Sequence, residues 1–177
     1  MMVAVPVSTG NAPVMDFFWV RGLRRISCST FQRLFLPVMY TLREARPDDR
    51  QAVVDVWDES GITQEWNDPP TDFDLAMESP GSTVLVAESP EGVVDGATIV
   101  GFDGHRGWIH MTGVRPSARG GGVGRLLSDG CVEWLRERKV PAVHLMVAEG
   151  NDAGRAFWEH LGYFKIEPPV YMISLED

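Results

Sequence analysis

The sequence predicts an α/β (α+β) fold with one mixed, mostly antiparallel sheet and helices on both of its faces. Three β-rich runs between residues 83 and 114 are separated by short glycine-containing turns, which indicates an antiparallel meander. A helical run and a further apolar run then follow, giving a strand, helix, strand unit in the second half. The length of 177 residues, 44% of them hydrophobic and 23% charged, is typical of one soluble globular domain.

The first half of this domain is expected to begin with a short strand over 41–45. A helix then opens at Pro47 and ends at Gly61, because proline and acidic residues suit a first helical turn. A loop over 64–70, closed by two prolines, leads to a second short helix over 72–78. The three strands of the meander are expected over 83–88, 93–102 and 108–114.

The second half contains the longest helix. Apolar residues recur every three or four positions over 122–138, which predicts an amphipathic helix. A buried strand over 142–147 comes next, followed by a helix over 151–161 that stops at Gly162. Two closing strands are expected over 163–166 and 170–175.

Charge and cysteine content exclude several classes of function. The chain has 16 lysines and arginines against 25 aspartates and glutamates, a formal net charge of −9, which disfavours a nucleic-acid partner. Two cysteines, Cys28 and Cys131, are too few for a disulfide framework or a zinc cluster. No apolar run reaches the ~20 residues that span a bilayer. We therefore expect a cytoplasmic protein without a metal or a membrane partner.

Residues 1–40 differ in composition from the rest. They carry four arginines against the single acidic residue Asp16, a net charge of +3, so residues 41–177 carry −12. This basic extension is not expected to be an export signal, although its arginine- and serine-rich composition resembles that of an organellar transit peptide. The alternatives are a disordered extension, or an upstream start codon with the true start at Met39. Either way, the functional domain is expected over 41–177.

A glycine-rich turn lies between the last strand of the meander and the longest helix. Residues 119–124 read Arg-Gly-Gly-Gly-Val-Gly, so bare backbone amides can converge on an anion at a helix N-terminus. A dinucleotide-binding fingerprint is excluded because its third glycine is missing. A P-loop is excluded because Gly124 is followed by Arg125 and Leu126 rather than by lysine and a hydroxyl residue. The turn therefore predicts an anion site of a different kind.

Two motifs give this site a family resemblance. Arg119, Gly122 and Gly124 fill the pattern (Arg/Gln)-x-x-Gly-x-(Gly/Ala). A second motif, Asn-x-x-Ala-x-x-(Leu/Phe)-Tyr-Glu-x-Leu-Gly-(Phe/Tyr), is matched by Asn151, Gly154, Phe157, Trp158, Glu159, Leu161, Gly162 and Tyr163. With both motifs in order, the chain over 41–177 resembles the GNAT (Gcn5-related) family of acetyl-CoA-dependent N-acetyltransferases. The loops around Trp66 and Asp103 look most like the small bacterial YpeA-type members.

The resemblance implies the GNAT acyl-CoA N-acyltransferase fold and a reaction. The implied reaction is direct attack by a primary amine of a small molecule, peptide or protein on the thioester of acetyl-CoA, in a ternary complex. The pantetheine would lie between two parallel strands that diverge, and the pyrophosphate would lie on the glycine-rich turn. A homodimer is compatible with this assignment. The implied cofactor-binding residues are Met111, Thr112, Gly113, Val114, Arg119, Gly120, Gly121, Gly122, Val123, Gly124, Arg125, Asn151, Phe157 and Trp158.

The proton source for the leaving thiolate is left open by the sequence. Trp158 stands where the family commonly has a tyrosine as general acid, and an indole N–H does not deliver a proton usefully at pH 7. Tyr163, a bound water and release of the thiolate without protonation are the alternatives. The departure from the pattern also supports a second hypothesis, a non-catalytic acyl-CoA-binding module that serves as a sensor or interaction domain.

The general base is predicted from strand periodicity. Alternation would place Trp108, His110, Thr112 and Val114 on one face of their strand, and His110 is the titratable residue among them. His110 is therefore one candidate base. Other candidates lie in loops or after the strand over 142–147: Glu65, Asp103, His105 and Glu149.

Overall fold

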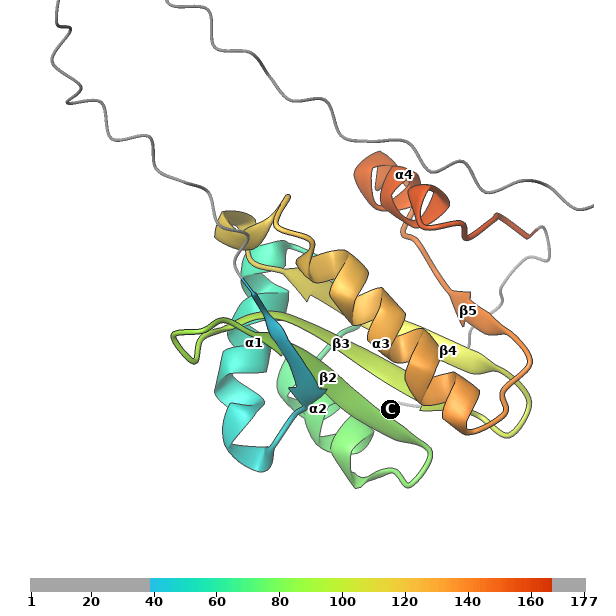
Figure 1. Cartoon of the computed structure of the whole chain (residues 1–177), viewed down its shortest axis with the longest axis horizontal. Helices are drawn as coiled ribbons and strands as arrows, with labels where there is room; N and C mark the ends of the chain where they lie inside the picture. Colours follow the sequence, from blue (N-terminus) through green and yellow to red (C-terminus); the bar gives the residue numbers. More distant parts are fainter. Residues whose placement is uncertain (1–38, 167–177) are drawn as a thin grey trace, which may run out of the picture. The chain divides into compact units, whose positions relative to one another are not determined.

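A computed structural model describes residues 39–166 of the chain and places a five-stranded sheet at its centre (Figure 1). The strands lie in the order β1-β2-β3-β4-β5. The first four are antiparallel neighbours, and β5 runs parallel to β4. The predicted mixed, mostly antiparallel sheet is thus confirmed. The strands span Thr41–Glu44, Ser82–Glu88, Val94–Phe102, Gly107–Val114 and Val143–Leu145.

Helices cover both faces of the sheet. Side chains of α1 and α2, among them Trp57 and Phe73, form one core cluster with β2 and β3. Side chains of α3, among them Leu127 and Leu135, form a second cluster on the opposite face, where Trp158 of α4 also packs. No helix in the span 39–166 is long and apolar enough to cross a membrane. The helices span Arg50–Ser60 (α1), Pro69–Glu78 (α2), Val123–Glu137 (α3) and Asp152–His160 (α4), and short 3-10 turns at Pro47–Asp49 (η1) and Pro116–Ala118 (η2) precede α1 and α3.

Helix α2 begins earlier than the sequence predicts. The two prolines assigned to a loop occupy the first turn of the helix, where a missing N–H costs no hydrogen bond. Asp68 caps this turn and accepts hydrogen bonds from the amide (3.4 Å) and the hydroxyl (2.8 Å) of Thr71. The prolines therefore mark the start of a helix rather than the end of a loop.

The C-terminal part also differs from expectation. Strand β5 is shorter than predicted and half-buried rather than buried, because it lies at the edge of the described sheet and pairs only with β4 there. Residues 163–166 do not form a strand. Instead, the amide of Tyr163 donates to the carbonyl of Trp158 and caps the C-terminus of α4. The strand expected over 170–175 lies outside the described residues.

A β-bulge interrupts β4 beside the candidate site. Ile99 of β3 pairs with His110 and Ala97 pairs with Gly113, so two residues of β4 oppose the single residue Thr98. The bulged residue Met111 has a φ of +50°, an uncommon conformation for a non-glycine residue.

The buried Thr98 hydroxyl supports the bulge. It donates to the carbonyl of His110 at 3.1 Å and lies 2.7 Å from the hydroxyl of Thr112. The bulge also breaks the strict alternation that the sequence predicts. Trp108 and His110 line the α2 face, whereas Val114 packs with the α3 cluster and Thr112 with Thr98.

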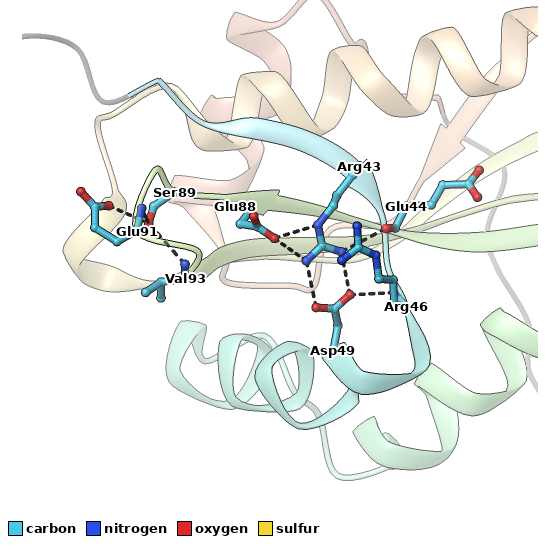
Figure 2. Close-up of polar contacts among 8 residues, drawn as sticks. All are labelled: Arg43, Glu44, Arg46, Asp49, Glu88, Ser89, Glu91 and Val93. Atoms are coloured by element: carbon cyan, nitrogen blue, oxygen red, sulfur yellow. Dashed lines mark hydrogen bonds and ion pairs between the residues drawn. The ribbon is translucent and has the colours of Figure 1, made fainter.

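An ionic cluster joins β1, η1 and β2 (Figure 2). The Arg43 guanidinium donates to both carboxylate oxygens of Asp49 (2.6 and 2.9 Å) and to one oxygen of Glu88 (2.8 and 2.5 Å). The Asp49 carboxylate also accepts the amide of Arg46 at 2.6 Å. The side chains of Arg43 and Asp49 are only 18% and 15% exposed. This cluster fixes the approach of the chain to α1, so it belongs to the scaffold of the site.

Candidate functional site

The parallel strands β4 and β5 pair over only part of the length of β4. Their register runs from the pair Gly107 and Val143 to the pair Ile109 and Leu145, where the pairing ends. Strand β4 continues to Val114, and the bulge at Met111 lies in this continuation. Backbone groups of β4 beyond Ile109 therefore have no partner from β5, which ends at Leu145.

The end of β4 leads through η2 to the N-terminus of α3. Gly120 and Gly122 have φ of +78° and +86°, and Gly122 is the N-cap residue. None of the described side chains caps this helix, so its first amides are available to an anion. A Cβ built on either glycine would meet no described atom within 4 Å. The turn therefore presents bare backbone amides to open space.

The other members of the glycine-rich turn have packing roles. A Cβ on Gly124 would lie 2.9 Å from the Cζ of Phe157, so the lack of a side chain at 124 leaves room for the Phe157 ring of α4. A Cβ on Gly121 would lie 3.2 Å from the carbonyl oxygen of Ala118. Val123 is buried in the α3 core cluster. The absence of a side chain at 124 thus reflects the packing of α4 on α3.

Arg119 and Arg125 differ in their surroundings. The Arg119 guanidinium donates to the carbonyls of Val114 (3.3 Å) and Ser60 (2.9 Å), which ties the turn to β4 and α1. The carbonyl of Val114, one of the implied cofactor-binding residues, thus already accepts a hydrogen bond from this arginine. Arg125 is exposed on the first turn of α3. Gly113 packs on α1, since a Cβ there would lie 2.6 Å from the Ser60 hydroxyl.

Helix α4 holds three of the implied cofactor-binding residues. The Asn151 side chain caps the helix by accepting the amide of Gly154 at 2.8 Å. The rings of Phe157 and Trp158 have centroids 5.0 Å apart, and Trp158 also lies 5.0 Å from Tyr163. These contacts give Trp158 a packing role on the α3 side of the sheet.

The three catalytic candidates do not converge. His110 lies on the α2 face and stacks on Trp108 with centroids 5.7 Å apart. The Tyr163 hydroxyl lies 3.1 Å from the hydroxyl of Ser128 in α3, on the opposite face, and burial raises its pKa. Glu65 is exposed in the loop between α1 and α2. Of these three, only His110 lies on β4, directly after the last residue that pairs with β5.

Asp72 of α2 is a further acidic residue of this site, and sequence reasoning missed it. Burial raises the pKa of Asp72, while a hydrogen bond from the Asn67 amide (3.3 Å) and the nearby His110 oppose the increase. Partial exclusion of water lowers the pKa of His110, and the Asp72 carboxylate opposes that decrease. Only its place in the first turn of α2 could have drawn attention to Asp72, because its approach to His110 depends on tertiary packing.

The remaining candidate bases lie in exposed turns. Asp103 accepts the amides of His105 (2.8 Å) and Arg106 (2.6 Å) and the indole N–H of Trp108 (2.8 Å). These hydrogen bonds lower the pKa of Asp103 to about 2, so it stays ionised and orders the hairpin. His105 and Glu149 are exposed.

Comparison with known proteins finds relatives that cover most of the described residues. A family model described as the acetyltransferase (GNAT) family matches residues 39–163. An acetyltransferase of Pectobacterium atrosepticum is 36% identical over 126 residues, which cover 71% of this chain and 89% of that protein.

Solved structures share the fold. A transcriptional regulator from Bacillus halodurans matches with a TM-score of 0.67 and 19% identity, over 77% of this chain and 100% of that one. An aminoglycoside N-acetyltransferase in complex with CoA matches with a TM-score of 0.66 and 13% identity, over 78% of this chain and 96% of that one. At these identities the two structures establish the fold alone. The family model and the Pectobacterium relative go further: the chain belongs to the acetyltransferase (GNAT) family.

Proposed function

We propose that this protein transfers the acetyl group of acetyl-CoA to a primary amine by direct attack within a ternary complex. The observation that carries the proposal is the stretch of β4 beyond Ile109 that has no partner from β5, followed by a helix N-terminus without a side-chain cap. Unpaired strand groups can hold the amides of pantetheine, and helix amides can hold a pyrophosphate.

The residues of the turn fit such a ligand. Gly120 and Gly122 would approach the pyrophosphate because no Cβ fills the space above them. The amides of Gly124 and Arg125 belong to the first turn of α3, where the helix dipole adds partial positive charge. The strand from Met111 to Val114 would hold the pantetheine. Bound acetyl-CoA supplies the thioester that the amine attacks.

His110 is proposed to take the proton that the attacking amine loses. Its lowered pKa keeps the imidazole neutral at pH 7, so it can accept a proton. The nearby Asp72 carboxylate then favours the protonated ring. Trp158 cannot donate a proton usefully, and Tyr163 is directed to Ser128. We therefore propose that the departing thiolate takes its proton from water.

Release of free thiol from acetyl-CoA, measured across a panel of primary amines, tests this function. Amine-dependent release is the expected result. A saturating concentration of CoA, about 100 times its Kd, should also raise the free energy of unfolding by about 2.7 kcal/mol. Protection by CoA without turnover on any amine would instead support the non-catalytic acyl-CoA-binding module. That alternative is favoured by the tryptophan at position 158.

A further inference from the structure

A groove of about 320 Å³ lies between the C-terminal half of α2, the end of β3 and the first half of β4. This volume is at the lower end of the range for small-molecule pockets. Its α2 wall includes Leu75, and its sheet side includes Ile99, Gly101, Trp108 and His110. The groove therefore contains His110, the catalytic candidate that follows the last pair of β4 and β5.

The lining of the groove is largely apolar and partly fixed in place. Leu75 is 62% exposed, so its side chain contributes accessible apolar surface to the groove. The Trp108 indole is held by the Asp103 carboxylate at 2.8 Å and stacks on His110. Gly101 leaves the groove floor without a side chain. The result is a flat aromatic and aliphatic surface that ends at a histidine.

The position and charge of the groove fit an amine. Ile99 pairs with His110 across the sheet, and the pairing of β4 with β5 ends next to it, at Ile109. Asp72 lies close enough to His110 to act on its charge, and residues 41–177 carry a formal charge of −12. A cationic amine is attracted to such surroundings, while its apolar substituent would gain by leaving water.

We propose that this groove binds the body of the acceptor, and that the acceptor is a small primary amine with a compact apolar or aromatic substituent. The amino group would lie at His110 and the substituent would lie against Leu75, Ile99 and Trp108. This inference rests on the proposed acetyl transfer and names its substrate class. Amines with additional hydroxyl or ammonium groups are disfavoured, because most of the lining is apolar and the Asp103 carboxylate in it already accepts the Trp108 indole and two backbone amides.

Rates of acetyl transfer to four amines test the inference. We expect kcat/KM for 2-phenylethylamine and hexylamine to exceed that for ethanolamine and putrescine by at least tenfold. Leu75→Ala should lower kcat/KM for 2-phenylethylamine about tenfold, chiefly through KM, and leave ethanolamine unchanged. Val93→Ala is the matched control, since Val93 is another exposed aliphatic residue (48%) and does not line the groove. It should alter neither rate.

A second variant fills the groove instead of enlarging it. Gly101→Val should lower kcat/KM for the two apolar amines selectively. The added Cβ would lie 3.3 Å from the Cβ of Ser82, so thermal unfolding is measured to show that the variant is folded. Preference for ethanolamine or putrescine, or an unchanged rate of 2-phenylethylamine acetylation in Leu75→Ala, overturns the groove assignment while leaving acetyl transfer intact. Absence of turnover on every amine, with CoA still bound, overturns the proposed function itself.

Discussion

Two glycines of the glycine-rich segment 119–124 lack side chains for different physical reasons. Gly122 has a positive φ and open space above it, whereas Gly124 makes room for the ring of Phe157. The sequence predicts the glycine-rich turn and its anion site, but it does not separate these roles. The contact at Gly124 joins residues that are distant in the chain, and only packing brings them together.

Replacement of His110 tests its role as the base. The unprotonated imidazole is the active form, so kcat/KM of the native protein should fall as the pH drops through the pKa of His110, which lies below the ordinary 6.5. His110→Ala should lower the rate and remove this acidic limb. His105→Ala, a change at an exposed histidine in the hairpin, should keep it. An acidic limb that survives in His110→Ala would rule out His110 as the base.

At the scale of elements, the bulge in β4 shows where periodicity fails as a predictor. Alternation would place four residues of β4 on one face of the sheet. The extra residue at Met111 instead moves the side chains that follow it to the opposite face from the one predicted. Met111 itself is not a turn residue, and Gly113 two positions later does not fix where the extra residue lies. The hydrogen bonds that hold it come from Thr98 in the neighbouring strand.

Removal of the Thr98 hydroxyl should therefore destabilise the bulge. Thr98→Val keeps the shape of the side chain and leaves the His110 carbonyl and the Thr112 hydroxyl without this partner. We expect a loss of about 1 to 3 kcal/mol in the free energy of unfolding, measured by denaturant titration. Thr83→Val is the control, since Thr83 is also buried and its hydroxyl has no bond within residues 39–166. Equal stability of the two variants would contradict this role of Thr98.

Two substitutions of Asn151 distinguish its role as the cap of α4 from a role in ligand binding. Asn151→Ala should cost about 1 kcal/mol through the lost helix cap and should also weaken CoA binding. Asn151→Ser should restore the unfolding free energy, because serine caps helices well, but not the CoA affinity, because serine lacks the amide donor. Full recovery of both quantities in Asn151→Ser would mean that Asn151 only caps the helix.

At the scale of the whole molecule, the sheet and its helices could be predicted because local patterns encode them. The meander, the amphipathic α3 and the strand that follows each carry their own periodicity. The ionic cluster of Arg43, Asp49 and Glu88 could not be predicted, since its members lie on three separate elements. The same holds for the approach of Asp72 to His110.

Loss of this ionic cluster should weaken the fold in a pH-dependent way. Arg43→Met leaves two carboxylates without their cation, and we expect a loss of about 2 to 3 kcal/mol in the free energy of unfolding at pH 7. The hydrogen bond from Arg43 holds the pKa of Asp49 below its ordinary 3.8. The stabilisation is thus present above pH 4 and is lost as the pH falls through the lowered pKa.

Denaturant unfolding of both proteins between pH 7 and pH 2 checks this prediction. The difference between the native protein and Arg43→Met should shrink below pH 4. A difference that stays constant to pH 2 would show that the cluster stabilises by packing alone.

The claim that α3 holds the pyrophosphate is tested most directly by calorimetric titration of CoA into three proteins: the native chain, Gly122→Asp and Gly92→Asp. Gly92 is a matched control, because its φ of +81° and its open surroundings resemble those of Gly122, while it lies in the β2–β3 turn. Both variants carry the same backbone strain of about 1 to 2 kcal/mol and the same added charge. We predict that Gly122→Asp weakens CoA binding at least tenfold and that Gly92→Asp binds as the native protein does. Equal affinity of all three proteins would contradict the account.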